Sequence, residues 1–214
     1  YIWVQLDQNR FADGSRARMT ETASEDILGY GALARAQRNA DVDHGFKIES
    51  VTDGRGRDLK YTIVDTMMRI DLPQALRSGQ STTFSIAWSF NIIEESVIGG
   101  RGGYDHFPES DTYIYFLAQW FPKLAAYTDY NGWKHQQFLG AGEFTQEFGD
   151  YEVEITVPAD HIVSATGELQ NESAVLTSEQ RRRLDESRSS DKPMFIVTPE
   201  EAIENEKEGT TDTK

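Results

Sequence analysis

Short runs in which apolar and polar residues alternate are the feature that most limits how this chain can fold. A period of two places the apolar side chains on one face of a strand. Such runs occur at residues 1–6, 59–63, 82–92 and 151–157, separated by segments rich in Gly, Pro, Asp and Ser. No helix of useful length is expected between them, so consecutive strands should pair antiparallel. The pattern predicts a mainly β chain, built as an antiparallel β-sandwich or saddle-like sheet domain with a few short helices, chiefly near the C-terminus.

Four segments carry the detail of this prediction. The turn at residues 53–56, Asp-Gly-Arg-Gly, lies between alternating runs, which predicts a hairpin. Residues 148–158 are the clearest strand, because Tyr, Val and Ile alternate there with Glu and Thr. Residues 161–167 are its expected hairpin partner. The aromatic stretch at residues 113–122 is expected to be buried or half-buried.

The chain is expected to divide near Asn171. Residues 1–171 are assigned to an N-terminal β domain that lacks its first strands, within which the polar segment 11–40 is expected to be a long loop with a helical turn at 24–28. Residues 172–214 are assigned to a helix-strand extension.

That extension has recognisable helix starts. Thr177 or Ser178 can cap a helix, and Thr198 followed by Pro199 predicts the start of another. A short strand is expected between them at residues 194–197.

Charge and composition exclude several kinds of function. The formal net charge is −15, whereas binding to phosphates or to anionic membrane surfaces needs clustered Lys and Arg. No run approaches the ~20 apolar residues that span a bilayer. The chain has no Cys, which excludes disulfides, thiolate zinc sites and cysteine nucleophiles. Nucleic acid and membrane are therefore not expected partners.

The first residues look like the interior of a strand. Tyr1 to Leu6 alternate from the first position with no polar lead, so we interpret the start as a cut end. A strand that begins inside a sheet would leave an open edge of unpaired N–H and C=O groups. Self-association through this edge is therefore a possible consequence.

Motifs for chemistry are sparse. The histidines at 44, 106, 135 and 161 show no i, i+4 pair, so surface or hydrogen-bonded histidines are expected rather than a metal site. No Gly-x-Ser-x-Gly occurs, and the Gly-rich residues 99–103 lack the Lys-Ser/Thr of a phosphate loop. With 36 Asp and Glu, a carboxylate pair of the glycosidase type would arise by chance, which leaves a glycosidase-like enzyme as a third hypothesis.

Several motifs, in their order along the chain, resemble one protein family. They are Trp3-Val-Gln-Leu-Asp-Gln-Asn-Arg-Phe, Leu72-Pro-Gln-Ala-Leu-Arg-Ser-Gly-Gln-Ser, Ala118-Gln-Trp-Phe-Pro, Leu139-Gly-Ala-Gly-Glu-Phe, Tyr151-Glu-Val-Glu-Ile-Thr-Val-Pro and Val163-Ser-Ala-Thr-Gly-Glu-Leu. The last two are the most specific, since Val-Pro-x-x-x-x-Val-x-Ala-Thr-Gly marks a hairpin of the family's N-terminal domain. Across nearly its whole length the chain resembles the N-terminal β domain of aminopeptidase N-like (gluzincin) zinc metallopeptidases, in a bacterial branch.

The resemblance implies a non-catalytic fragment. In the family, a saddle-shaped β domain packs on a thermolysin-like domain that holds zinc through His-Glu-x-x-His and a later Glu, and that carries a Gly-x-Met-Glu-Asn motif. This sequence contains none of those motifs. We therefore expect no catalytic residue, metal ligand or cofactor in the fragment, and zinc in the parent protein. The implied partners are the missing catalytic domain and the N-terminus of a peptide substrate, in an exported, periplasmic or cell-surface setting.

The resemblance also suggests substrate-binding residues. The family's N-terminal domain supplies a Gln or Glu that binds the substrate's free α-amine, and Gln119 is the candidate here, with Trp120 and Tyr115 shaping the pocket. Glu143, within a Gly-Ala-Gly-Glu-Phe stretch, is interpreted as a turn or surface residue because it lies in the wrong place for the exopeptidase motif.

Two hypotheses from different classes therefore stand ahead of the glycosidase-like one. The first is the N-terminal domain fragment of a zinc aminopeptidase-like metallopeptidase, helping to form the pocket for the substrate N-terminus. The alternative is a stand-alone β-sandwich module that binds carbohydrate or peptide through exposed Trp3, Trp88 or Trp133. Buried tryptophans and a buried aromatic stretch would instead be parts of a core.

Overall fold

The computed structural model describes residues 1–20, 29–31, 33–34, 37, 42–95, 102–140 and 146–208. The chain divides into two compact units, Tyr1–Gly149 and Asp150–Lys214. Each unit is described by itself. The division lies earlier than the expected boundary near Asn171, and the assignment of residues 1–171 to one domain stays a prediction.

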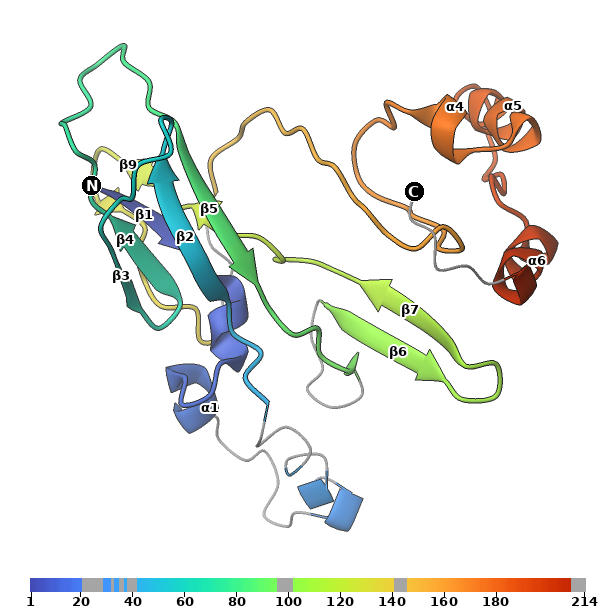
Figure 1. Cartoon of the computed structure of the whole chain (residues 1–214), viewed down its shortest axis with the longest axis horizontal. Coiled ribbons are helices and arrows are strands. Elements are labelled where there is room, and N and C mark those ends of the chain that lie inside the picture. The colour runs from blue at the N-terminus through green and yellow to red at the C-terminus, as the bar shows by residue number, and fades with distance from the viewer. Residues whose placement is uncertain are drawn as a thin grey trace. The chain divides into compact units, whose positions relative to one another are not determined.

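The first unit contains a four-stranded sheet in the order β3-β4-β1-β8, of which Figure 1 labels β1, β3 and β4. Its strands are β1 (Ile2–Gln5), β3 (Tyr61–Val64), β4 (Met67–Ile70) and β8 (Lys123–Leu124), and every pairing between them is antiparallel. Strand β1 therefore has a neighbour on each side. The open edge that we expected at β1 is wrong, and self-association of the chain stays a prediction.

A second sheet pairs β2 (Lys47–Asp53) with β5 (Phe84–Ser89), and the two strands run side by side along their length (Figure 1). The sheets pack face to face through one hydrophobic cluster. Its buried members are Ile2, Val4, Leu6, Phe46, Val51, Leu59, Met68 and Ile70. Because β1 alternates with a period of two, its even-numbered residues enter this core, whereas Gln5 points to the opposite face and is buried there as well.

Short elements complete the first unit. They are the 3₁₀ helix η1 (Asp7–Phe11), α1 (Arg16–Thr20), the hairpin of β6 (Gly103–Phe107) with β7 (Thr112–Phe116), and the hairpin of β9 (Tyr127–Thr128) with β10 (Gly132–Trp133). In the second hairpin, residues 129–131 form the turn.

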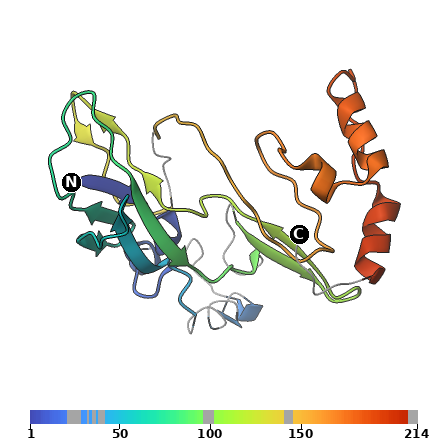
Figure 2. The same ribbon diagram turned by 45° about the horizontal axis from the view of Figure 1, so that its top comes forward.

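The second unit contains the helices α4 (Glu172–Val175), α5 (Ser178–Ser187) and α6 (Pro199–Glu208), which are the orange and red ribbons of Figure 2. Both long helices begin as the sequence predicts. Thr177 caps α5 through a capping box with Gln180. Thr198 and Glu201 exchange the same two hydrogen bonds at the start of α6.

Within the described residues, no helix has the length and apolar character needed to cross a membrane.

The fold class is confirmed: the chain is mainly β, with antiparallel sheets and a few short helices, chiefly near the C-terminus. Local corrections are needed. The turn at residues 53–56 makes only a short local pairing, in which Leu59 N donates to Val51 O. The main partner of β2 is β5, because Phe84, Ile86 and Trp88 supply the apolar face that covers the shared core.

Three expected strand segments are wrong. Residues 148–158, 161–167 and 194–197 contain no strand in the structure. Alternation is not enough for a strand, because each backbone group also needs a hydrogen-bonded neighbour. Tyr151, Val153 and Ile155 are instead exposed. The helical turn expected at residues 24–28 lies outside the described residues.

The exposure of the aromatic stretch is also corrected. Tyr113 and Tyr115 on β7 are 44% and 45% exposed, so this strand is more open to solvent than expected. The residues that follow it, Trp120 and Phe121, are half-buried as expected.

Replacing Ile70 by Ala is expected to lower the free energy of unfolding by roughly 2–5 kcal/mol, because the change leaves a cavity in the core. Ile70 is 0% exposed, whereas Ile114 is 52% exposed and provides a matched control. Ile114→Ala should cost less than about 1 kcal/mol. Urea unfolding of both variants measures the difference, and equal losses would contradict the placement of the core.

An ion pair joins α5 to α6 and should make this contact sensitive to acid. Arg183 donates two hydrogen bonds to Glu201, one of 3.0 Å, and together with the Thr198 N–H holds the pKa of Glu201 at about 2, below its usual 4.5. A lowered pKa in the folded state means that the stabilisation is present above about pH 4.5 and is lost as the pH falls toward 2.

We therefore expect the backbone amides of α6 in the unsubstituted chain to lose protection from hydrogen exchange as the pH falls from about 4.5 to 2. Glu201→Gln should remove most of this pH dependence, because the amide cannot titrate. Glu200→Gln, at the exposed neighbouring position, is the control and should leave it unchanged. NMR amide signals of α6 report the effect locally, and a pH response that survives Glu201→Gln would rule out this ion pair as its source.

Candidate functional site

The segment between β7 and β8 contains Gln119, the residue singled out from the sequence. Gln119 has a φ of 56°, in the left-handed region that non-glycine residues seldom occupy. Such a conformation persists only where surrounding contacts enforce it, and it is common at binding sites. The contacts that hold this turn therefore define the candidate site.

Two side chains fix the backbone of the turn. Gln8 Nε2 donates to the carbonyl oxygen of Gln119 at 3.3 Å. Trp88 Nε1 on β5 donates to the carbonyl oxygen of Trp120, also at 3.3 Å. The two successive carbonyl groups are thus held from opposite parts of the first unit, one by η1 and the other by the β2–β5 sheet.

The 3₁₀ helix η1 is itself held by buried polar contacts. Asn9 Oδ1 accepts from Phe46 N at 2.8 Å, and Asn9 Nδ2 donates to the Asp65 carbonyl oxygen at 2.8 Å. Gln8 and Asn9 are both buried. One short helix therefore connects the start of β2, the turn between β3 and β4, and the Gln119 segment.

A buried ion pair fixes the end of the same segment. Lys123 Nζ on β8 contacts Asp7 Oδ2, and the two residues are 8% and 3% exposed. Gln5, which pairs with Lys123 in the ladder between β1 and β8, is 1% exposed, and its side-chain amide has no hydrogen-bond partner among the described residues. Electrostatic interactions are strong in such an environment, so the pair holds β8 firmly against η1.

The side chain of Gln119 has the properties of a binding group. It is half-buried, and the structure gives its amide no partner within the described parts of the chain. A carboxamide offers an oxygen acceptor and an NH₂ donor. Directed at an ammonium group, the oxygen would accept a charge-assisted hydrogen bond, which is stronger than one between neutral groups.

Aromatic rings surround the turn. The Trp120 ring lies 6.4 Å from that of Trp88 and 5.0 Å from that of Phe121, measured between ring centroids. The expectation that Trp120 shapes a pocket beside Gln119 stays a prediction. Tyr115 is instead part of the β6–β7 hairpin, where its ring lies against Tyr104 and Tyr113.

Each histidine has a hydrogen-bond contact through one ring nitrogen, whereas Nε2 of His44 is buried without a partner among the described residues. His44 Nδ1 lies 3.2 Å from the Asn91 carbonyl oxygen and His106 Nε2 lies 3.0 Å from Asp111 Oδ1. His135 and His161 have partners of the same kind. Across the described parts of the chain, no three His, Cys, Asp or Glu side chains cluster as a metal site would require. Glu143 lies outside the described residues.

Sequence reasoning missed the residues that hold the site. From the sequence alone Asp7, Gln8 and Asn9 have the composition of a polar turn, because nothing local distinguishes a buried polar residue from an exposed one. The available signal was the apolar β1 immediately before them, which carries this turn into the core.

Comparison of the chain with models of protein families, with curated proteins and with solved structures found no match.

Replacing Lys123 by Met is expected to destabilise the first unit by about 3–5 kcal/mol, because Asp7 would keep a buried charge without its partner. The double variant Asp7→Leu with Lys123→Met should recover most of this loss, since both charges are then removed. Lys60→Met, at an exposed position, is the control. Urea unfolding of these three variants and of the unsubstituted chain measures their stabilities. A double variant no more stable than Lys123→Met would contradict the ion pair between Asp7 and Lys123.

Proposed function

We propose that this chain is the non-catalytic N-terminal β domain, in fragment form, of a zinc aminopeptidase-like metallopeptidase. Its role is to help form the pocket for the substrate's N-terminus. The observation that carries the proposal is Gln119, with its left-handed backbone, its carbonyl held by Gln8 and its half-buried side-chain amide without a partner among the described residues. The order of motifs along the sequence is the reason for proposing this family. The geometry around Gln119 supports a role for this residue in binding the amine.

The chemistry follows from the ligand. The α-amine of a peptide is a compact cation at neutral pH, and Gln119 Oε1 can accept one of its N–H groups. The protein behind this contact would leave no room for further residues on the amine side, which would restrict cleavage to single N-terminal residues. The acidic chain, with a net charge of −15, favours the approach of a cation.

The reaction itself belongs to the parent protein. There, a zinc ion held by the catalytic domain would activate the attacking water, as it does in zinc peptidases generally. The residues of this chain would bind and orient the amine only.

In the full-length parent, Gln119→Ala is expected to lower kcat/KM for an aminoacyl p-nitroanilide by roughly ten- to a hundredfold. This range corresponds to the loss of one hydrogen bond to a charged group, about 1.5–3 kcal/mol. Gln136→Ala, at an exposed position, is the matched control. Steady-state kinetics of the two variants, with circular dichroism to confirm folding, make the measurement.

Two results would remove the proposal. The first is a coding sequence for the parent protein without His-Glu-x-x-His. The second is a Gln119→Ala variant with the kcat/KM of the control. Stoichiometric zinc in the purified 214-residue chain would also count against it, since the metal belongs in the absent domain.

The alternative, a carbohydrate-binding module that uses exposed tryptophans, gains no support from the side chains that it would need. Trp3, Trp88, Trp120 and Trp133 are all half-buried. Each packs on another ring; Trp3, for example, stacks on His135 at 5.1 Å. Iodide quenching of tryptophan fluorescence should accordingly be weak.

A further inference from the structure

One face of the β6–β7 hairpin consists entirely of aromatic side chains. We call it the aromatic face, and it is made of Tyr104, His106, Tyr113 and Tyr115. Tyr104 is opposite Tyr115 in the ladder and His106 is opposite Tyr113. Residues directly opposite in an antiparallel pair share a face of the sheet, and so do residues two positions apart on a strand. The four rings therefore lie on one surface.

The rings contact one another in a row. His106 stacks on Tyr113 with 4.3 Å between centroids, and the rings of Tyr113 and Tyr115 are nearly parallel, at 16° and 6.2 Å. Tyr104 lies 6.0 Å and 6.1 Å from these two tyrosines. Mutual packing of this kind orders the side chains before any ligand arrives, which lowers the entropic cost of binding.

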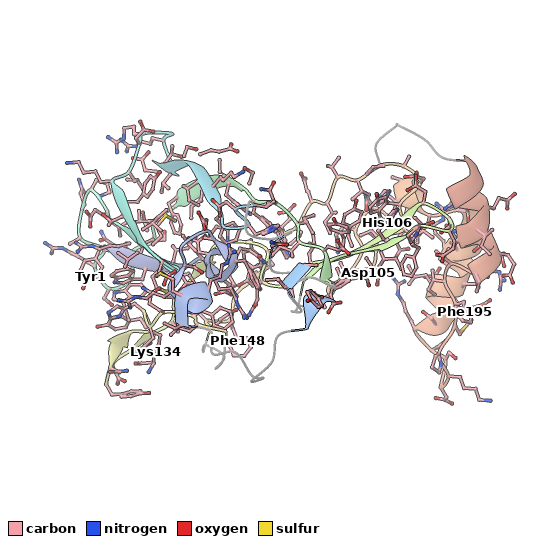
Figure 3. All side chains as sticks on the ribbon, turned by 90° about the horizontal axis from the view of Figure 1, so that it is seen from below. Tyr1, Asp105, His106, Lys134, Phe148 and Phe195 are labelled. Atoms are coloured by element: carbon pink, nitrogen blue, oxygen red, sulfur yellow. The ribbon has the colours of Figure 1, made fainter. Side chains whose placement is uncertain are left out.

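The aromatic face is accessible. Tyr113 and Tyr115 are 44% and 45% exposed, and the side chain of His106 is 32% exposed. Figure 3 labels His106 with its neighbour Asp105 on β6. Exposed aromatic clusters of this kind are unusual on a protein surface and mark sites of interaction.

The charges around the face select a class of ligand. From Gly102 to Pro122 the sequence contains neither Lys nor Arg. Of its three carboxylates, Asp105 lies on the opposite face of the hairpin, whereas Glu109 and Asp111 belong to the turn between β6 and β7. Asp111 binds His106 Nε2 at 3.0 Å at the end of the row, and its side chain is 85% exposed. Electron-rich ring faces and neighbouring carboxylates both attract a cation.

We propose that the aromatic face binds arginine side chains of a cationic peptide. A guanidinium group is planar and weakly hydrated, so it stacks on a tyrosine ring more readily than a lysine ammonium does. Its N–H groups could reach the Asp111 carboxylate at the same time. A neutral sugar would gain the ring contact only and would make no use of the Asp111 carboxylate.

The proposal does not depend on the aminopeptidase assignment. The aromatic face belongs to β6 and β7, whereas the amine-binding role rests on Gln119 beyond the end of β7. Either can fail while the other stands, because different substitutions and different ligands test them.

The test is an NMR titration of the 214-residue chain with the peptide Gly-Arg-Gly-Arg-Gly. The expected shifts concern the ring protons of Tyr113 and Tyr115 and the backbone amides of β6 and β7. Tyr113→Leu should weaken binding by about two- to fivefold, and Tyr113→Leu with Tyr115→Leu by about five- to twentyfold. Tyr113→Phe should bind normally, because the ring face is retained. If the leucine variants do not fold, the position of the shifts in the unsubstituted chain is the test, and shifts confined to residues outside β6 and β7 would contradict the proposal.

The matched control is on the same hairpin. Phe107→Leu makes the same aromatic-to-aliphatic change on the opposite face, at a residue that is 43% exposed, and should leave binding unchanged. The peptides Gly-Lys-Gly-Lys-Gly and Gly-Gln-Gly-Gln-Gly should bind more weakly, in that order. Added salt should lower the affinity for the arginine peptide, since the contact is electrostatic in part.

Three outcomes would overturn the proposal. Equal affinity for the lysine and arginine peptides, unaffected by Tyr113→Leu, would mean only general attraction to an acidic protein. Equal losses in Phe107→Leu and Tyr113→Leu would assign the effect to hairpin stability. Tighter binding of the neutral sugar cellohexaose, insensitive to salt and lost in Tyr113→Leu, would make the face a carbohydrate platform instead.

Discussion

The buried polar contacts of η1 are the interaction on which the first unit depends. The side chains of Asp7, Gln8 and Asn9 each reach a different part of the chain, and all three residues are removed from solvent. Polar groups in such surroundings are costly unless they are paired, so each contact is strongly favoured once its neighbours are in place. The helix thus orients the β8 strand, the Gln119 turn and the turn between β3 and β4 relative to one another. A binding role for Gln119 would draw on this rigidity.

Much of the fold could be predicted because its signals are local. In β1, apolar and polar residues alternate with a period of two, and α5 begins with Thr177 and Gln180 in a capping box. Both signals can be read from a few adjacent residues. The choice of Gln119 also came from the sequence, through a resemblance in motif order. Its left-handed backbone could not be foreseen, because the contact from Gln8 that accompanies it comes from 111 positions away.

The failures have one physical cause. Alternation states which face of a segment is apolar, but it does not state which other segment covers that face. Strand β2 pairs along its length with β5 and only briefly across the turn at residues 53–56, where Thr52 is opposite Asp58. Residues 151–157 have the pattern of a strand without the neighbour that would make them one. The exposed tyrosines of β7 belong to the same category. Their pattern indicated a core, whereas the structure leaves one aromatic face accessible.

The hydrogen bonds between Gln137 and the turn at Thr66 have a consequence for how the chain acquires its structure. Gln137 accepts from both the backbone N–H and the hydroxyl of Thr66 and donates to Val64 O, although more than 70 residues separate these positions. Strand β1 likewise waits for β8, since Gln5 pairs with Lys123. Contacts of such long range are slow to form, because a large loop must close before any of them is made. On the ribosome, β1 would therefore remain without one of its two neighbours until the more than 110 residues that separate it from β8 had been synthesised. During that interval its apolar face would be exposed to chaperones and to other nascent chains.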